Sequence, residues 1–441
     1  MRSWFDATVA ALQQRLRPQE SFALWFAGEE SHFVRLNHGR IRQAGFVRQA
    51  HARLQLMRSG RGVTGRLTLQ GQPAADRRLL TRWLQDQREH LAVLPPDPHL
   101  VVPDAVQSSE LVEDTPLPDS SEAIGEIIDA AGDLDLVGLY ACGPLYRGFA
   151  NSQGQRNWMH RNSVHFDWSL YGSGDCSVKD SYAGAAWDEP IVRRKLRQGQ
   201  QRLAIMQRPV KTLVPGHYRA YLASAAVGEI LSTVACWGGF SLRAHRDKTS
   251  ILQGLSSGRQ RFRQDVTLRE DSCHGFAPLF QEQGFIRPRE TTLVREGTAA
   301  SLLASPRSAR EYNVACNGAG DSEMPVALDL AAGQLSRQDV LAELGTGLYV
   351  GNLWYLNPSD AAAGRLTGMT RFFTCWVQNG QWVAPVAPMR FDDTVYHLLG
   401  EHLVALTRER ERMLDPSTYS ERSTASMHVP GILLSDLCLT L

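Results

Sequence analysis

The chain has 441 residues, too many for one ordinary hydrophobic core, so we expect two or three domains. Hydrophobic residues make up 43% and charged residues 21%, the usual balance of a soluble globular protein. The formal net charge of +1 excludes an electrostatic argument for binding nucleic acid or an anionic membrane.

The first predicted element is an amphipathic helix at the N-terminus. One helical face carries Phe5, Val9, Leu12 and Leu16, with polar residues between them in the sequence. A signal peptide has an uninterrupted apolar region instead. Elsewhere no stretch approaches the roughly 20 uninterrupted apolar residues that a membrane helix needs. We therefore expect a cytoplasmic protein that spans no membrane.

Residues 1–94 are predicted to form a first α+β lobe. Alternating apolar and polar side chains indicate an antiparallel meander, in which His38-Gly39 predicts a hairpin turn. The segment 74–94 has the apolar spacing of a helix. Residues 95–118 are rich in proline, acidic residues and serine, so we expect a linker on the surface.

A second α+β lobe is predicted over residues 119–210. A short helix ends at Gly132, and long alternating strands flank a turn at 151–154. Another helix begins at Pro190, because the fixed φ of proline suits the first helical turn.

Residues 211–441 have a mostly β texture and form the third predicted region. Asn379-Gly380 is a strong hairpin signal between two strand-like runs. An apolar stripe predicts a helix at 224–234, and the segment 393–410 has the pattern of another. The predicted fold class is therefore α+β, with a two-lobed N-terminal α+β region followed by a β-rich C-terminal domain.

The cysteines predict neither a disulfide framework nor a zinc knuckle. Their number is odd, they are scattered, and no two of them form a C-x-x-C pair. The seven cysteines are Cys142, Cys176, Cys236, Cys273, Cys316, Cys375 and Cys438.

One short motif, at residues 254–258, matches the G-x-S-x-G pattern of a serine nucleophile, with Ser256 at its centre. A nucleophile elbow needs a buried apolar strand before the serine and a helix after it, whereas both flanks here are polar and charged. Short motifs also produce many false matches. A mobile, Gly/Ser-rich loop is the favoured interpretation.

A second near match is H-L-L-G-E-H at residues 397–402. The inverzincin motif H-x-x-E-H brings two histidines to one metal, but the spacing here is one residue longer. On an α-helix, His397 and Glu401 share a face while His402 points elsewhere. The leucines of the segment already account for it as an ordinary amphipathic helix.

Three other groups have plain structural interpretations. Cys273 and His274 are neighbours in sequence and point in different directions, so they do not form a dyad. His160 and His165 lie an odd number of residues apart in a strand and therefore face opposite sides of the sheet. The basic run at 193–197 is interpreted as a solvated helix face rather than a nucleic-acid patch.

The order of several segments resembles the TldD/PmbA family, also known as modulators of DNA gyrase. The resemblance covers nearly the whole chain, and the ordered set is more specific than any single piece. The matching segments are a hairpin at 33–43, a turn at 150–154, a strand at 214–222, a strand at 345–351, a hairpin at 376–386 and the tail at 429–434.

This resemblance implies a peptidase assembled from two related subunits. The TldD-type subunit carries H-E-x-x-x-H on a helix and a later cysteine, so that two imidazoles and a thiolate hold zinc while the glutamate serves as base. In this chain the corresponding positions are Ser224, Ala225 and Glu229. The C-G-K-x-G-Q segment that supplies the cysteine is absent, and Cys438 lies too late in the chain to replace it.

We therefore expect a non-catalytic, TldE/PmbA-type subunit that binds no metal itself. It is expected to pair with a zinc-holding TldD-like subunit that cleaves small or unfolded peptides, and to form a homodimer when alone. Two alternatives stay open. One is an autonomous hydrolase that uses Ser256 or the His397 segment, and the other is a stand-alone peptide-binding protein.

Overall fold

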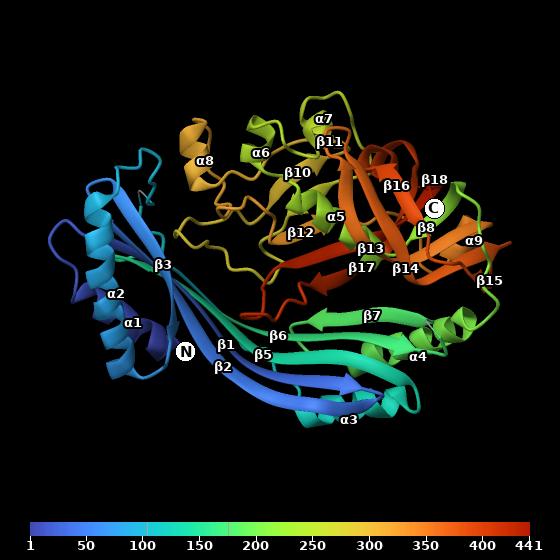
Figure 1. The fold of residues 1–441 in the computed structure, drawn as a ribbon, viewed down its shortest axis with the longest axis horizontal. Helices are drawn as coiled ribbons and strands as arrows, with labels where there is room; N and C mark the ends of the chain where they lie inside the picture. The colour runs from blue at the N-terminus through green and yellow to red at the C-terminus, as the bar shows by residue number, and fades with distance from the viewer. Residues whose placement is uncertain (104, 175) are drawn as a thin grey trace.

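The computed structural model describes every residue of the chain except 104 and 175. It contains two large sheets with helices packed on both, which confirms the predicted α+β class (Figure 1). Within the described residues, no helix is both long and apolar enough to cross a membrane.

The first sheet has seven strands in the order β3-β2-β1-β5-β6-β4, with β7 also paired to β6. All pairs are antiparallel except β4 with β6. The strands are β1 (Ser21–Asn37), β2 (Arg40–Arg58), β3 (Arg61–Leu69), β4 (Ser109–Glu113), β5 (Asp135–Asn151), β6 (Arg156–Tyr171) and β7 (Ser177–Gly184).

The antiparallel pairing of β1 with β5 joins the two predicted N-terminal regions into this one sheet. Two helices cover each end of it (Figure 1). They are α1 (Arg2–Gln13) and α2 (Pro73–Val93) at one end, and α3 (Ser120–Ala131) and α4 (Glu189–Met206) at the other. Each pair has its own hydrophobic cluster. The segment 95–118, predicted as a surface linker, contributes the edge strand β4.

Both predicted hairpin turns are confirmed, and their backbone explains the residues found there. His38 and Gly39 connect β1 to β2 with φ of +50° and +65°. Asn379 and Gly380 connect two later strands with φ of +54° and +72°. Two-residue turns of this kind require positive φ at both central positions, which glycine adopts freely and asparagine and histidine adopt more readily than most residues.

The second sheet has eleven strands in the order β11-β10-β9-β12-β18-β16-β14-β13-β8, with β15 on β14 and β17 on β18. A further pairing of β8 with β18 closes five of them into a ring. The strands are β8 (Gly216–Leu222), β9 (Leu268–Glu270), β10 (Thr291–Arg295), β11 (Thr298–Ala299), β12 (Ala327–Leu330), β13 (Gly347–Asp360), β14 (Arg365–Gln378), β15 (Gln381–Pro385), β16 (Arg390–Thr394), β17 (Leu403–Leu414) and β18 (Ser426–Leu439).

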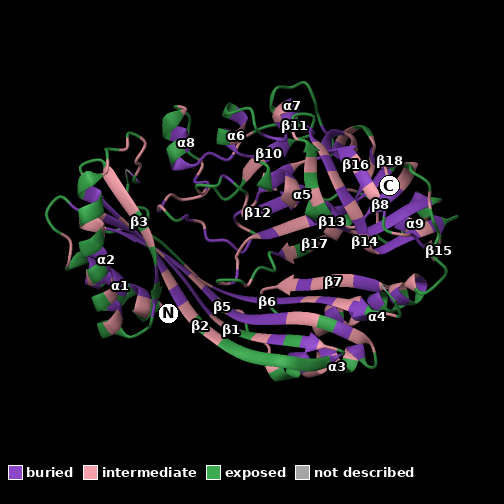
Figure 2. Cartoon of the chain, in the orientation of Figure 1, coloured by how far each residue is buried: buried purple, intermediate pink, exposed green. Residues whose placement is uncertain are grey.

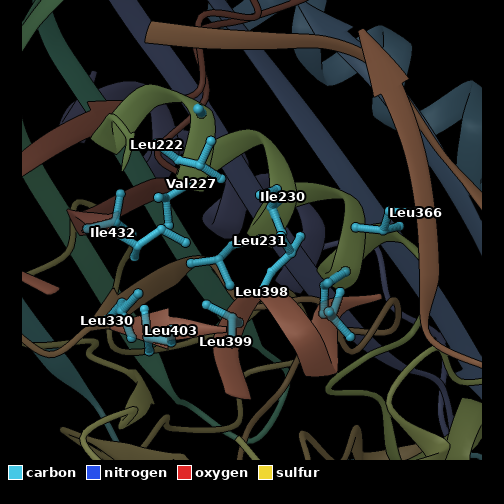
Figure 3. Packing of buried hydrophobic residues seen from close by; sticks show 14 of the residues in the cluster. Leu222, Val227, Ile230, Leu231, Leu330, Leu366, Leu398, Leu399, Leu403 and Ile432 are labelled. Atoms are coloured by element: carbon cyan, nitrogen blue, oxygen red, sulfur yellow. The ribbon is translucent and has the colours of Figure 1, made fainter. Parts of the chain in front are cut away.

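The long helix of the C-terminal part is α5 (Ser224–Cys236), at the predicted place. Its apolar stripe, which includes Val227 and Leu231, packs into the largest hydrophobic cluster of the protein (Figure 3). The other helices of this part have six residues or fewer. They are α6 (Leu242–Arg246), α7 (Gln253–Ser256), α8 (Pro306–Glu311) and α9 (Val340–Leu344).

The helix predicted at 393–410 is wrong. The structure has the end of β16 there, then a single π-helical turn η1 (His397–Glu401), and then β17. Leu399, Leu403 and Leu406 do recur at helical spacing, but antiparallel pairing of β17 with β18 satisfies the backbone instead. Long-range pairing overrides local periodicity at this place.

The two sheets are held together by charges as well as by apolar side chains. Lys195 Nζ on α4 lies 2.6 Å from a carboxylate oxygen of Asp180 on β7 and 3.3 Å from one of Glu411 on β17. The other oxygen of Glu411 lies 2.9 Å from Arg337 Nη1. The prediction that the run 193–197 is a solvated face is therefore wrong at Lys195, whose side chain is only 14% exposed.

One edge of the first sheet is open along half of β2. Strand β3 pairs only with residues 50–58 of β2, and within the described residues no other strand pairs with the outer side of residues 40–49. This stretch is exposed, including Ile41 and Phe46 (Figure 2). Unpaired strand edges are places where another chain can add.

Candidate functional site

The candidate site lies at the start of α5, which β8 holds in place. Strand β8 runs between β13 and β18 and leads directly into the helix. The Ala223 N–H donates to the Val350 carbonyl at 2.9 Å, which fixes the chain where it enters the helix. The face of α5 that does not enter the core therefore has a defined orientation.

The three positions predicted to correspond to the metal motif lie in the first two turns of α5. Ser224 is buried, Ala225 is partly buried and Glu229 reaches the surface. Partial burial raises the pKa of Glu229, and Lys179 only partly offsets this. One hydroxyl, one methyl group and one carboxylate do not supply the three or four nitrogen, sulfur or oxygen ligands of a zinc site.

The end of β17 and the start of β18 face this helix. A Cβ on Gly228 would lie 2.7 Å from the Met413 Cε, and the Ser232 hydroxyl lies 3.9 Å from the Met427 Sδ. The connection between the two strands, residues 415–425, leads from these contacts to the first sheet, where the Ser420 carbonyl accepts from the Gln49 side chain at 2.8 Å. It contains no cysteine and no histidine, so it adds no zinc ligand of the expected kind.

Cys438 lies at the opposite end of this arrangement. It pairs with His217 at the start of β8, whereas α5 follows the end of that strand. The residues present around α5 thus do not fit a zinc ion.

The β17–β18 connection is anchored in the first sheet by Arg422, which is buried. Its guanidinium donates to Ser31 Oγ at 3.2 Å, to the Gly143 carbonyl at 3.3 Å and to Ser163 Oγ at 2.6 Å. The Arg147 guanidinium in turn donates to the Arg422 carbonyl at 2.9 Å. These hydrogen bonds, which no local pattern in the sequence predicts, fix the β17–β18 connection against the first sheet.

A recess of about 320 Å³ lies beside the connection, lined by residues of β9, β12, β17 and β18. Asp329 in its wall accepts from Arg410 at 2.5 Å. The Arg412 guanidinium lies 5.6 Å from the centre of the Phe276 ring, and among the described residues no carboxylate is within ion-pair distance of it. Such a recess can accept a group that is negatively charged or rich in hydrogen-bond acceptors.

Ser256 lies at the end of the short helix α7 and not in an irregular loop. Its hydroxyl lies 2.8 Å from His245 Nδ1, while His245 Nε2 lies 2.9 Å from the Gly239 carbonyl. A carbonyl only accepts, so Nε2 carries the proton and Nδ1 accepts from the serine. The predicted absence of a strand before the serine is correct, but this pairing with a histidine eleven residues away was not predicted.

His402 does not point away from His397 and Glu401, so that prediction is wrong. Among the described residues, these three form the one group of three or more potential metal ligands whose ligand atoms all lie within 4.8 Å of one another. The π-helical turn, which the sequence analysis missed, brings them together. The group lies beside the start of β8, close to Cys438.

The remaining candidates have structural partners. His274 pairs with Asp271 through a contact of 2.8 Å. His160 is partly exposed and stacks on Tyr146, whereas His165 is buried, which agrees with their predicted placement on opposite faces of the sheet.

The burial of His165 predicts an acid-sensitive fold. Burial first, and then Arg422 and Lys179, lower its pKa from 6.5 to about 4. Because the unfolded chain binds a proton between these two values and the folded chain does not, stability falls as the pH drops through this window. Because of His165, we expect the free energy of unfolding to fall by about 2 kcal/mol between pH 7 and pH 5.

The measurement is urea unfolding at both pH values for the wild type and for His165→Gln. The variant should lose less stability on acidification than the wild type, whatever its stability at pH 7. Equal losses of stability in the two proteins would contradict the assignment of this acid sensitivity to His165.

Comparison with known proteins gives a family and a fold. Residues 215–440, just over half of the chain, match the family model of the PmbA/TldA metallopeptidase C-terminal domain. No curated protein matches the sequence. Three solved structures have the same overall fold at 14% identity, a level that speaks for the fold alone.

The first is TldE from Thermococcus kodakarensis, with a TM-score of 0.80 over 99% of this chain and 100% of that one. The second is described as a modulator of DNA gyrase from Thermotoga maritima, with a TM-score of 0.75 over 100% of both chains. The third has the same description, comes from Bacteroides thetaiotaomicron, and has a TM-score of 0.74 over 100% of this chain and 98% of the other.

Proposed function

Because the chain belongs to the PmbA/TldA metallopeptidase family, we propose that it is the non-catalytic, TldE-type subunit of a cytoplasmic two-subunit peptidase. In this proposal a TldD-like partner holds the zinc ion, and the complex degrades or processes small or unfolded peptides. This chain supplies no metal ligand at α5 and contributes to the partner's conformation or to the substrate cleft.

The observation that carries the proposal is a complete fold around a site that does not fit zinc. Helix α5, the strand before it, and strands β17 and β18 with their connection are all present, yet the positions predicted for the motif hold Ser224, Ala225 and Glu229. Buried contacts such as those of Arg422 still position the connection. A scaffold that is kept without its catalytic groups is consistent with a binding or supporting role.

The open edge of β2 supports the proposal that a partner binds at this surface. Residues 40–49 offer unpaired backbone groups, and Ile41 and Phe46 are 53% and 56% exposed. A partner strand would bury both the apolar side chains and the backbone hydrogen-bonding groups. Subunits that function only together commonly bury more than about 2,000 Å² in total, and a second copy of this chain could occupy the same edge when the partner is absent.

The recess lined by residues of β9, β12, β17 and β18 supports the proposal of peptide binding to the C-terminal sheet. Main-chain hydrogen bonds to a strand edge bind extended peptides with little dependence on sequence. Arg412, which lacks a carboxylate partner among the described residues, is in addition available to donate to a peptide carboxylate or carbonyl. The test of the proposed function is a peptide-cleavage time course with this chain, with a TldD-like subunit and with both.

The hydrogen bond between Ser256 and His245 favours one alternative, an autonomous serine hydrolase. However, the orienting partner of His245 is a carbonyl rather than a carboxylate, and Ser256 follows turns instead of a buried strand. We therefore expect Ser256→Ala to leave the peptidase activity of the complex within about twofold of wild type. A true nucleophile would lose several orders of magnitude, and a loss of that size would establish the hydrolase instead.

A further inference from the structure

The turn η1 gives residues 397–402 a geometry that an α-helix does not allow. The His402 N–H donates to the His397 carbonyl at 2.9 Å, an i to i+5 bond that closes one π-helical turn. In such a turn, residues i+4 and i+5 both lie next to residue i. The His397 Nε2 is accordingly 3.8 Å from a Glu401 carboxylate oxygen, and the two imidazole rings have centres 5.0 Å apart.

A buried carboxylate orients the first imidazole. Asp393, 4% exposed, lies 3.0 Å from His397 Nδ1 and also accepts the Thr394 N–H at 2.7 Å. Because a carboxylate accepts, Nδ1 carries the ring proton, and the lone pair on Nε2 points outward to Glu401. Metal-bound histidines almost always donate their other ring N–H to a carboxylate or carbonyl in this way.

The second imidazole is held by the neighbouring strand β18. The Ser435 N–H donates to the His402 carbonyl at 2.8 Å, and Asp436 lies 3.9 Å from His402 Nε2. The same carboxylate oxygen of Asp436 lies 2.7 Å from His217 Nδ1. The pair of imidazoles is thus surrounded by three carboxylates, those of Asp393, Glu401 and Asp436.

The backbone of the turn is held by the hydrophobic core. Leu398 and Leu399, between the two histidines, are buried and pack under Leu231 of α5 (Figure 3). In contrast, the side chains of His397 and Glu401 are 43% and 72% exposed. The backbone is therefore fixed by the core, while the polar side chains have room to close on an ion.

We propose that His397, Glu401 and His402 bind one divalent transition-metal ion of the Zn²⁺ type. The three ligand atoms lie within 4.8 Å of one another. Rotation of these partly exposed side chains would bring them to the distances of about 2.0–2.2 Å that zinc requires. Two imidazoles and one carboxylate suit zinc and its neighbours, whereas calcium and magnesium prefer oxygen ligands alone. Three protein ligands leave one coordination position open to water or to a ligand from outside.

This ion is separate from the zinc of the proposed TldD-like partner, and it departs from the expectation that the chain binds no metal. The site lies beside the start of β8, whereas α5 begins after the end of that strand. Substitutions at α5 should therefore leave it intact.

The test uses the full chain without an affinity tag, freed of metal by a chelator and titrated with Zn²⁺ alone in a calorimeter. We expect one saturable site per chain with micromolar or tighter affinity. His397→Ala and Glu401→Gln should each weaken it at least tenfold. Glu401 is the more exposed of the two, so its variant keeps the test valid even if His397→Ala disturbs the fold.

Two matched variants serve as controls. His274→Ala removes an exposed histidine that also pairs with an aspartate, and Glu229→Gln alters the carboxylate on α5. Both should bind Zn²⁺ like the wild type. Absence of saturable binding in the wild type, equal affinity in Glu401→Gln, or an equal loss in His274→Ala would each overturn the proposal.

Discussion

The purified chain is expected to leave unfolded peptides uncleaved, and mixing it with a TldD-like subunit is expected to produce cleavage that a chelator abolishes. The physical reason is the division of groups between the subunits. Ser224, Ala225 and Glu229 do not assemble a zinc-bound water, and activation of such a water is the source of metallopeptidase activity. The expected change is from no detectable cleavage to measurable turnover.

Three samples decide the outcome: this chain, the partner, and the two mixed at equal concentration. Phe46→Asp, on the open edge of β2, should lower the activity of the mixture at low concentration and lose its effect at high concentration, since it weakens assembly rather than chemistry. Val93→Asp, at an exposed position on α2, is the matched control.

Two results would contradict the central proposal. One is chelator-sensitive cleavage by this chain alone, with no partner in the preparation. The other is a mixture that is inactive although the two chains associate. Association without a gain in activity would favour a stand-alone peptide-binding protein.

The parts of the fold that depend on local chemistry could be predicted from the sequence. His38-Gly39 and Asn379-Gly380 form their hairpins because those residues adopt the positive φ that the turns require. Helix α5 was predictable because its apolar stripe recurs at helical spacing and enters a single core.

The parts that depend on contacts between distant residues could not be predicted. The leucines around 399–406 have helical spacing, and only the pairing of β17 with β18 makes the segment a strand. The π-helical turn has no local signature, so the convergence of His397 with His402 was missed. The pairing of Ser256 with His245 and the burial of Lys195 likewise depend on elements that meet only in the folded chain.

Removing Glu411 from the charge network between the sheets is expected to cause the largest loss of stability. Burial alone would raise the pKa of Glu411, but Lys195 and Arg337 outweigh it and lower the pKa to about 2. The carboxylate is therefore ionised in the folded protein at neutral pH and neutralises two cations at the contact between α4 and β17. Its contribution is present above its usual pKa of 4.5 and is lost as the pH falls towards 2.

Replacing Glu411 by alanine should lower the free energy of unfolding at pH 7 by roughly 2–4 kcal/mol, because it leaves Lys195 and Arg337 crowded without their shared anion. Glu411→Gln should lose nearly as much, since the amide keeps the shape but not the charge. Glu189→Ala, which breaks the more exposed pair with Arg193 on the same helix, should cost no more than about 0.5 kcal/mol. Urea unfolding at pH 7 measures all three variants. If Glu411→Ala cost no more than Glu189→Ala, the network would be no stronger than a surface ion pair, and the contact between the sheets would depend on apolar packing alone.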